Sequence, residues 1–119
     1  MARSTPRTEY PPENDEERRR RRRRLAQTLA VGGMDDVHVL SHESADEILT
    51  PRRRELIHTL NQTEVDSVRE LASLVERDHG QVSRDLQTLA EHGIVEFEQS
   101  GRAKRPSLQH AHVVIEPVV

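Results

Sequence analysis

The spacing of apolar residues divides the chain into a helical middle and flanking stretches in which apolar and polar residues alternate. Between residues 50 and 93, leucine, isoleucine and valine recur at three- and four-residue intervals, which predicts three successive helices. A short polar side chain at a helix N-cap accepts a hydrogen bond from a free amide of the first turn. Four such starts occur after residue 40: Ser44 with Glu47, Thr50-Pro51, Ser67 with Glu70, and Asp78 with Gln81. Gly93 predicts the end of the last helix.

Beyond Gly93 the period of the pattern changes from 3.6 to 2. Residues 94–98 predict one strand, Ser100-Gly101 begins a turn, and residues 113–115 predict a closing strand. A short strand is also expected at residues 36–40. Two helices, a tight turn, a third helix and a β-hairpin are the order of a winged helix-turn-helix. The predicted fold is therefore mainly α with a small antiparallel β-sheet (α+β).

The third helix, residues 78–92, is the candidate for reading a DNA duplex. A turn of 100° per residue places Val82, Leu86, Leu89 and Ala90 on one stripe, which predicts the buried side. The opposite side then carries Gly80, Gln81, Arg84, Gln87, Thr88 and Glu91, with Ser83 at its flank. Arginine can bond guanine and glutamine can bond adenine in the major groove, whereas Gly80 permits close backbone approach. For Arg84, an ion pair with Asp85 or Glu91 is the alternative.

The expected tip of the hairpin, residues 101–106, is basic. Arg102, Lys104 and Arg105 lie there between a glycine and a proline. Such a loop can lie along phosphates or enter a minor groove. The candidate DNA-binding residues are therefore Gly80, Gln81, Ser83, Arg84, Gln87, Thr88, Arg102, Lys104 and Arg105.

The formal net charge is −3, but its distribution is uneven, because residues 1–34 are net basic and residues 35–119 net acidic. We therefore divide the chain into an Arg-rich N-terminal arm (1–34) and a winged domain (35–119). Residues 1–13 should be disordered, and residues 15–30 can form a helix capped by Asn14. The run Arg18 to Arg24 is either a solvated tail or a mobile arm that neutralises phosphates.

The run Arg52 to Arg54 begins a helix, where the helix dipole disfavours cations. Either a bound phosphate or the nearby Glu47 and Glu55 should compensate these charges.

Metal and catalytic chemistry find little support in the composition. The 119 residues include no Cys, and 2% are aromatic, so the core must be aliphatic. His110 and His112 would share a strand face, but two histidines are fewer ligands than a metal site normally needs. Because no phosphate loop, nucleophile elbow or paired carboxylates are recognisable, we predict no enzyme, no cofactor and no metal. Without an apolar run of 18 residues or a signal peptide, a soluble cytoplasmic protein is expected.

Four segments resemble the small MarR-like winged-helix transcriptional regulators common in archaea. They are residues 49–56 (LTPRRREL), 68–72 (VRELA), 83–86 (SRDL) and 101–106 (GRAKRP). The resemblance spans roughly residues 36–118 and implies DNA binding through the third helix and the wing, usually by a homodimer. The chain departs from the family at residues 109–112, where QHAH stands in place of a frequent Pro-Tyr-Asp-Glu stretch.

The expected function is sequence-specific binding of double-stranded DNA as a transcriptional regulator. Two half-sites would give a homodimer useful specificity, and the dimer surface would use residues 37–40, Leu25 and Leu29, or residues 113–119. A winged protein-interaction module of the antitoxin type and a metal sensor using His110 and His112 are the alternatives.

Overall fold

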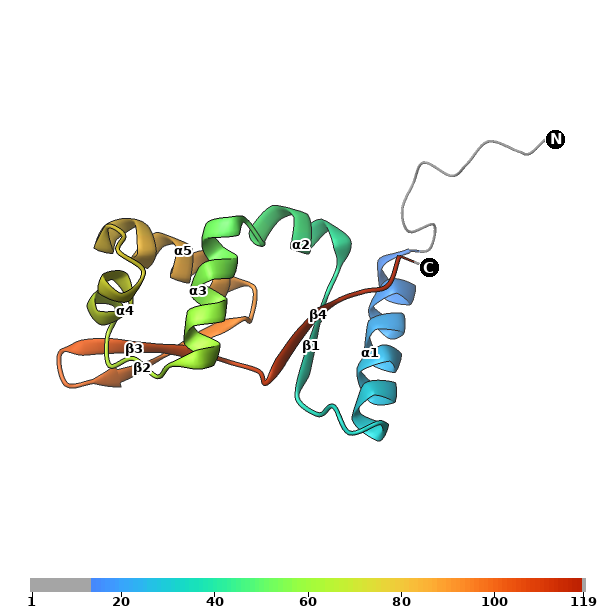
Figure 1. Cartoon of the computed structure of the whole chain (residues 1–119). Coiled ribbons are helices and arrows are strands. Elements are labelled where there is room, and N and C mark those ends of the chain that lie inside the picture. Colours follow the sequence, from blue (N-terminus) through green and yellow to red (C-terminus); the bar gives the residue numbers. More distant parts are fainter. Residues whose placement is uncertain (1–13, 119) are drawn as a thin grey trace.

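The computed structural model describes residues 14–118 and is mostly helical. The elements in order are α1 (Asp15–Val31), β1 (Val37–Leu40), α2 (His42–Ile48), α3 (Pro51–Gln62), α4 (Val68–Leu74), α5 (His79–Glu91), β2 (Val95–Ser100), β3 (Ala103–Leu108) and β4 (His112–Ile115). Helices α3 to α5 and the antiparallel β2–β3 hairpin form the predicted winged helix-turn-helix (Figure 1). The expected disorder of residues 1–13 lies outside the described residues.

Most helices begin where local capping predicts. The side chains of Asn14, Thr50, Ser67 and Asp78 each accept a hydrogen bond from the amide three residues later. The expected start at Ser44 is wrong, because α2 begins at His42 and its N-cap is Ser41. Ser41 Oγ accepts from Ser44 N at 3.1 Å, and Glu116, 74 residues away, accepts from His42 N at 3.0 Å. A long-range contact from Glu116 thus accompanies a helix start that lies three residues before the expected one.

The core is aliphatic, as the composition requires, and lies between the three helices and the hairpin. Leu56 of α3, Leu71 of α4 and Leu86 of α5 are fully buried at its centre. Val82 and Leu89 complete the predicted buried stripe of α5, whereas Ala90 is only half-buried. The positive φ of Gly93, 75°, ends α5, and the chain then enters the hairpin through the buried Ile94 and Val95.

The hairpin is longer and tighter than the alternating pattern predicts. Strand β2 pairs with β3 from Val95↔Leu108 to Ser100↔Ala103, so only Gly101 and Arg102 form the turn. Residues 103–106, expected in a basic loop, instead belong to β3, and Pro106 is buried opposite Phe97. Gly101 closes the turn at a φ of 63°, a conformation that glycine adopts without steric cost.

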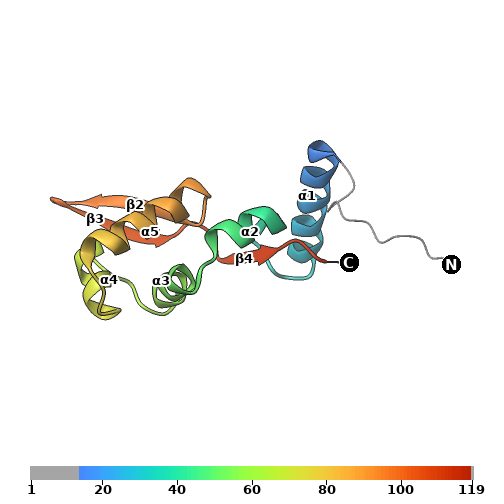
Figure 2. The ribbon, with the colours of Figure 1, turned by 90° about the horizontal axis from the view of Figure 1, so that it is seen from above.

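A second, parallel two-stranded sheet joins the segment after α1 to the C-terminal part of the described chain. Strand β1 pairs with β4, from Val37↔His112 to Leu40↔Ile115. The strands expected at residues 36–40 and 113–115 therefore form, but the alternating pattern did not indicate that they pair with each other. Helix α1 packs along β1 on the side away from the winged unit, and the hairpin turn lies at the other end of the molecule (Figures 1 and 2). Within residues 14–118, the helices are all too short or too polar to cross a bilayer.

Candidate nucleic-acid interface

Helix α5 turns a polar surface away from the core. Val82, Leu86 and Leu89 are fully buried, and the opposite side of the helix is exposed at Gln81, Ser83, Arg84 and Gln87. Two further predicted site residues, Gly80 and Thr88, are half-buried. The hydroxyl of Thr88 donates to the Arg84 carbonyl oxygen at 3.3 Å, which leaves its oxygen and methyl group as contact points. The structure therefore brings all six predicted α5 residues onto one helix surface.

Arg84 is a cation on this surface without an acidic partner. The alternative pairing with Asp85 or Glu91 does not form, and no salt bridge to Arg84 occurs within residues 14–118. A Cβ added at Gly80 would lie 3.6 Å from an Arg84 guanidinium nitrogen and 3.1 Å from the Asp78 carboxylate. The missing side chain of Gly80 thus leaves room for Arg84 to lie over the first turn of α5.

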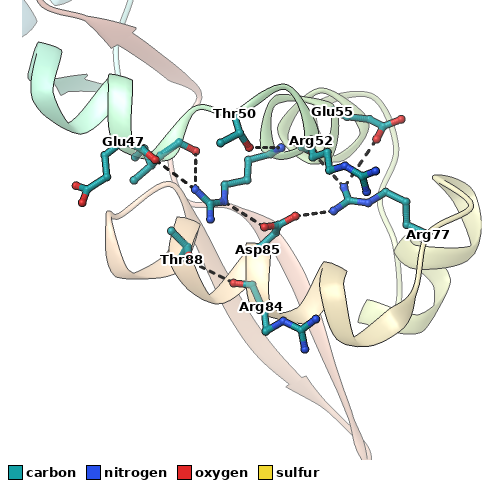
Figure 3. Close-up of polar contacts among 10 residues, drawn as sticks. Glu47, Thr50, Arg52, Glu55, Arg77, Arg84, Asp85 and Thr88 are labelled. Carbon is teal, nitrogen blue, oxygen red and sulfur yellow. Dashed lines mark hydrogen bonds and ion pairs between the residues drawn. The ribbon is translucent and has the colours of Figure 1, made fainter.

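Asp85 holds α5 against α3 and was missed by the sequence reasoning. Its two carboxylate oxygens accept from Arg53 Nε at 3.1 Å and from an Arg77 guanidinium nitrogen at 2.5 Å (Figure 3). Arg77 also donates to the Arg52 carbonyl oxygen at 3.1 Å and lies 3.8 Å from Glu55. We call Asp85, Arg53 and Arg77 the arginine clamp. The clamp joins the start of α3, the α4–α5 turn and the middle of α5.

Within the run Arg52 to Arg54, Arg53 and Arg54 bind different partners. Arg53 belongs to the clamp and also donates to the carbonyl oxygens of Glu47 and Ile48, at 3.4 Å each. The Nε of Arg54 donates to the Leu49 carbonyl oxygen at 3.2 Å. Either a bound phosphate or the carboxylates of Glu47 and Glu55 were expected to compensate these cations, and for Arg53 and Arg54 the carboxylates do not do so. Carbonyl groups at the end of α2 and Asp85 do so instead, because α2 ends directly against the start of α3.

The cations of the wing lie on two faces of the hairpin. Neighbouring residues of a strand point to opposite sides, so Lys104 and Arg105 diverge. Lys104 is exposed, pairs in register with Gln99, and has its Nζ 5.7 Å from the centre of the Phe97 ring. Arg105 pairs with Glu98, 3.9 Å from its Nε. Arg102 is exposed in the turn. Among residues 14–118 no acid lies within ion-pair distance of Arg102 or Lys104, so their charges are less offset than that of Arg105.

The Arg-rich helix α1 is held to the rest of the molecule by buried charge. Glu116, which is 8% exposed, lies 3.4 Å from an Arg22 nitrogen and 3.7 Å from one of Arg18. Arg18 also donates to Glu43, and this hydrogen bond lowers the pKa of the Glu43 carboxyl below its usual range. Two members of the arginine run therefore anchor α1, whereas Arg19, Arg20, Arg23 and Arg24 are exposed.

The histidines near the wing form a structural cluster. His110 lies in a bend before β4, so the expected strand face shared by His110 and His112 is wrong. The Asp36 carboxylate binds His110 Nδ1 at 2.8 Å and the Ala111 amide at 2.9 Å, and both hydrogen bonds lower the Asp36 pKa. His110 stacks on His38 with ring centres 5.0 Å apart. No group of three potential metal ligands occurs in the part of the chain that the structure describes.

The fold and this surface define a winged helix-turn-helix protein. The family model HVO_A0114 matches residues 48–115, more than half of the chain, from the end of α2 to the end of β4. The chain belongs to the HVO_A0114 family. A search of curated proteins finds no match.

One similar solved structure comes from Mycobacterium bovis. It is the solution NMR structure of the homodimeric winged helix-turn-helix DNA-binding domain (fragment 1–100) of Mb0332, described as a possible ArsR-family transcriptional regulator. The two chains share 20% identity with a TM-score of 0.52, and the match covers 82% of this chain and 73% of that one. This likeness confirms the predicted winged fold. The MarR-like and archaeal parts of the predicted resemblance stay predictions.

Proposed function

We propose that this protein is a transcriptional regulator that binds double-stranded DNA sequence-specifically. The observation that carries the proposal is the exposed guanidinium of Arg84, which has no acidic partner among the described residues and lies among further hydrogen-bond donors on α5. An unpaired arginine on an otherwise net acidic domain indicates an anionic or acceptor-rich partner. A major groove offers such acceptors, the O6 and N7 atoms of guanine.

In this proposal α5 enters the major groove and the wing contacts the flanking backbone or the minor groove. Arg84 reads a guanine, whereas Gln81 and Gln87 are suited to adenine edges. Gly80, Ser83 and Thr88 allow close approach of the helix to the duplex. Arg102 and Lys104 hold phosphates beside the groove, and Arg105 adds a weaker contact because Glu98 offsets its charge.

We further propose that the protein binds its site as a homodimer. A single helix reads only a few base pairs, so two copies on two half-sites supply the specificity that a regulator needs. The description of the Mb0332 domain as homodimeric supports this proposal. Within residues 14–118, β1 and β4 pair only with each other, so a second copy can add a strand to this sheet.

Selection of bound duplexes from a random pool, followed by titrations, tests the proposal. Arg84→Ala should weaken binding by about 1–3 kcal/mol and relax the preference at one base position. Lys104→Ala should weaken all sequences alike and lower the salt slope by about one. Arg24→Ala, which removes an equal charge from α1, is the matched control. Failure to enrich any sequence, or equal effects of Arg84→Ala on selected and scrambled duplexes, would contradict base reading by α5.

A further inference from the structure

A shallow cleft lies beside the proposed reading surface, between the start of α3 and the first half of α5. Its volume is about 200 Å³, and its walls are Arg52, Arg77, Gln81, Arg84 and Asp85. Because Gln81 and Arg84 belong both to the cleft and to the exposed face of α5, a duplex docked on α5 would pass its mouth. Figure 3 shows Arg52, Arg77 and Arg84 arranged around Asp85.

The charged side chains exposed in this cleft are arginines. The only carboxylate in its wall, Asp85, is already bound by Arg53 and Arg77 through both oxygens. The Arg77 side chain is 9% exposed, and its buried Nε–H has no acceptor within residues 14–118. Arg52 and Arg84 are exposed, and no acid lies within ion-pair distance of either guanidinium among the described residues. Two cations therefore remain for a ligand.

We propose that this cleft binds a phosphate of the DNA backbone, with Arg52 as its principal contact. This site rests on the proposed function, because its occupant is a phosphodiester of the duplex that α5 reads. A guanidinium presents two parallel N–H groups that match the two free oxygens of a phosphodiester. The Gln81 amide adds another donor at the same wall. A shallow cleft of about 200 Å³ accommodates one phosphate of a strand that lies across it.

The neighbouring arginines provide an internal contrast. Arg52 and Arg54 are two positions apart on α3 and therefore project to nearly opposite sides of the helix. Arg54 lines a different groove of about 660 Å³, shared with Ile57 and His58. Both side chains are exposed and each carries one positive charge, so Arg54 is a charge-matched control for Arg52. The site thus assigns phosphate binding to Arg52, the clamp to Arg53 and no DNA contact to Arg54.

The test measures binding of the full chain to a selected and a scrambled duplex by fluorescence anisotropy at several salt concentrations. Arg52→Ala should weaken both complexes by the same factor and lower the salt slope by about 0.9. Arg54→Ala should leave both affinities and the slope unchanged. Arg52→Lys should restore part of the loss, since it keeps the charge without the planar fork. Circular dichroism checks that each variant is folded.

Each contrary result has a distinct meaning. Equal losses for Arg52→Ala and Arg54→Ala would overturn the site, because overall charge alone would then explain both. A loss confined to the selected duplex would also overturn it, since Arg52 would then read a base. Saturable binding of inorganic phosphate that Arg52→Ala abolishes without weakening the duplex would assign the cleft to a free anion. A wild-type chain that binds no duplex would instead overturn the proposed function itself.

Discussion

Removal of the Asp85 carboxylate should destabilise the fold far more than loss of an ordinary surface ion pair. The Asp85→Ala substitution deletes the acceptor of two arginines, of which Arg77 is 9% exposed and Arg53 22%. Breaking a fully buried ion pair by removing one partner costs about 3–5 kcal/mol. Because Asp85 itself is 19% exposed, and Arg53 keeps two carbonyl acceptors, we expect a cost of about 2–3 kcal/mol.

Thermal unfolding followed by circular dichroism at 222 nm measures this cost. A loss of 2 kcal/mol corresponds to a lower midpoint by about 8–16 °C for a domain of this size. Asp85→Asn should fall between wild type and alanine, because its carbonyl oxygen still accepts one hydrogen bond. In a double-mutant cycle, Arg77→Met should cost much less in the Asp85→Ala background than in wild type. A change below about 0.5 kcal/mol for Asp85→Ala, typical of exposed pairs, would refute the clamp.

Three further predictions concern the elements around the winged unit. Burial lowers the pKa of the His38 imidazole below its ordinary value of 6.5. As the pH falls, His38 is therefore protonated in the unfolded chain before it is protonated in the folded chain. Stability should therefore fall as the pH drops below 6.5, and less so in His38→Gln, as urea unfolding at pH 7.5 and 5.5 would show. A pH-independent difference between the two chains would contradict this. Glu116→Ala should cost about 1–3 kcal/mol, because it removes the carboxylate that accepts from Arg22 and from the His42 amide. The same substitution should speed proteolysis between α1 and β1, and unchanged proteolysis would argue against anchoring of α1. Gly101→Ala should cost about 1–2 kcal/mol because of the positive φ at the turn, whereas Ser107→Ala, in β3, should not.

The sequence predicts the features that depend on near neighbours. Capping at Thr50, Ser67 and Asp78 involves residues three positions apart, so local chemistry alone determines these helix starts. The buried stripe of α5 follows equally from the helical period, with only Ala90 misplaced at its edge. The same arithmetic places Arg84 and Gln87 on the exposed side.

Features that depend on distant contacts escape such reasoning. The N-cap of α2 is Ser41 rather than Ser44, in a place where Glu116 from the far end of the chain binds the His42 amide. The parallel pairing of β1 with β4 joins segments about 75 residues apart, and short alternating runs do not specify a partner. Asp85 resembles any charged helix residue until the fold brings Arg53 and Arg77 to it.

The divergence of Lys104 and Arg105 follows from the strand period only once the length of the hairpin turn is known. If residues 101–106 formed a loop, Lys104 and Arg105 could point the same way. Once the turn contains only Gly101 and Arg102, the strand period places them on opposite faces, and Glu98 comes to lie opposite Arg105.

Chemical-shift mapping by NMR tests most directly whether α5 and the wing form one duplex-binding surface. Titration of the ¹⁵N-labelled chain with its selected duplex should shift the amides of residues 80–88 and 101–104 most. The amides of α1 should move little in the same titration. Shifts concentrated on α1, with those of α5 unchanged, would contradict the account, because the arginine run and not the winged unit would then bind the DNA.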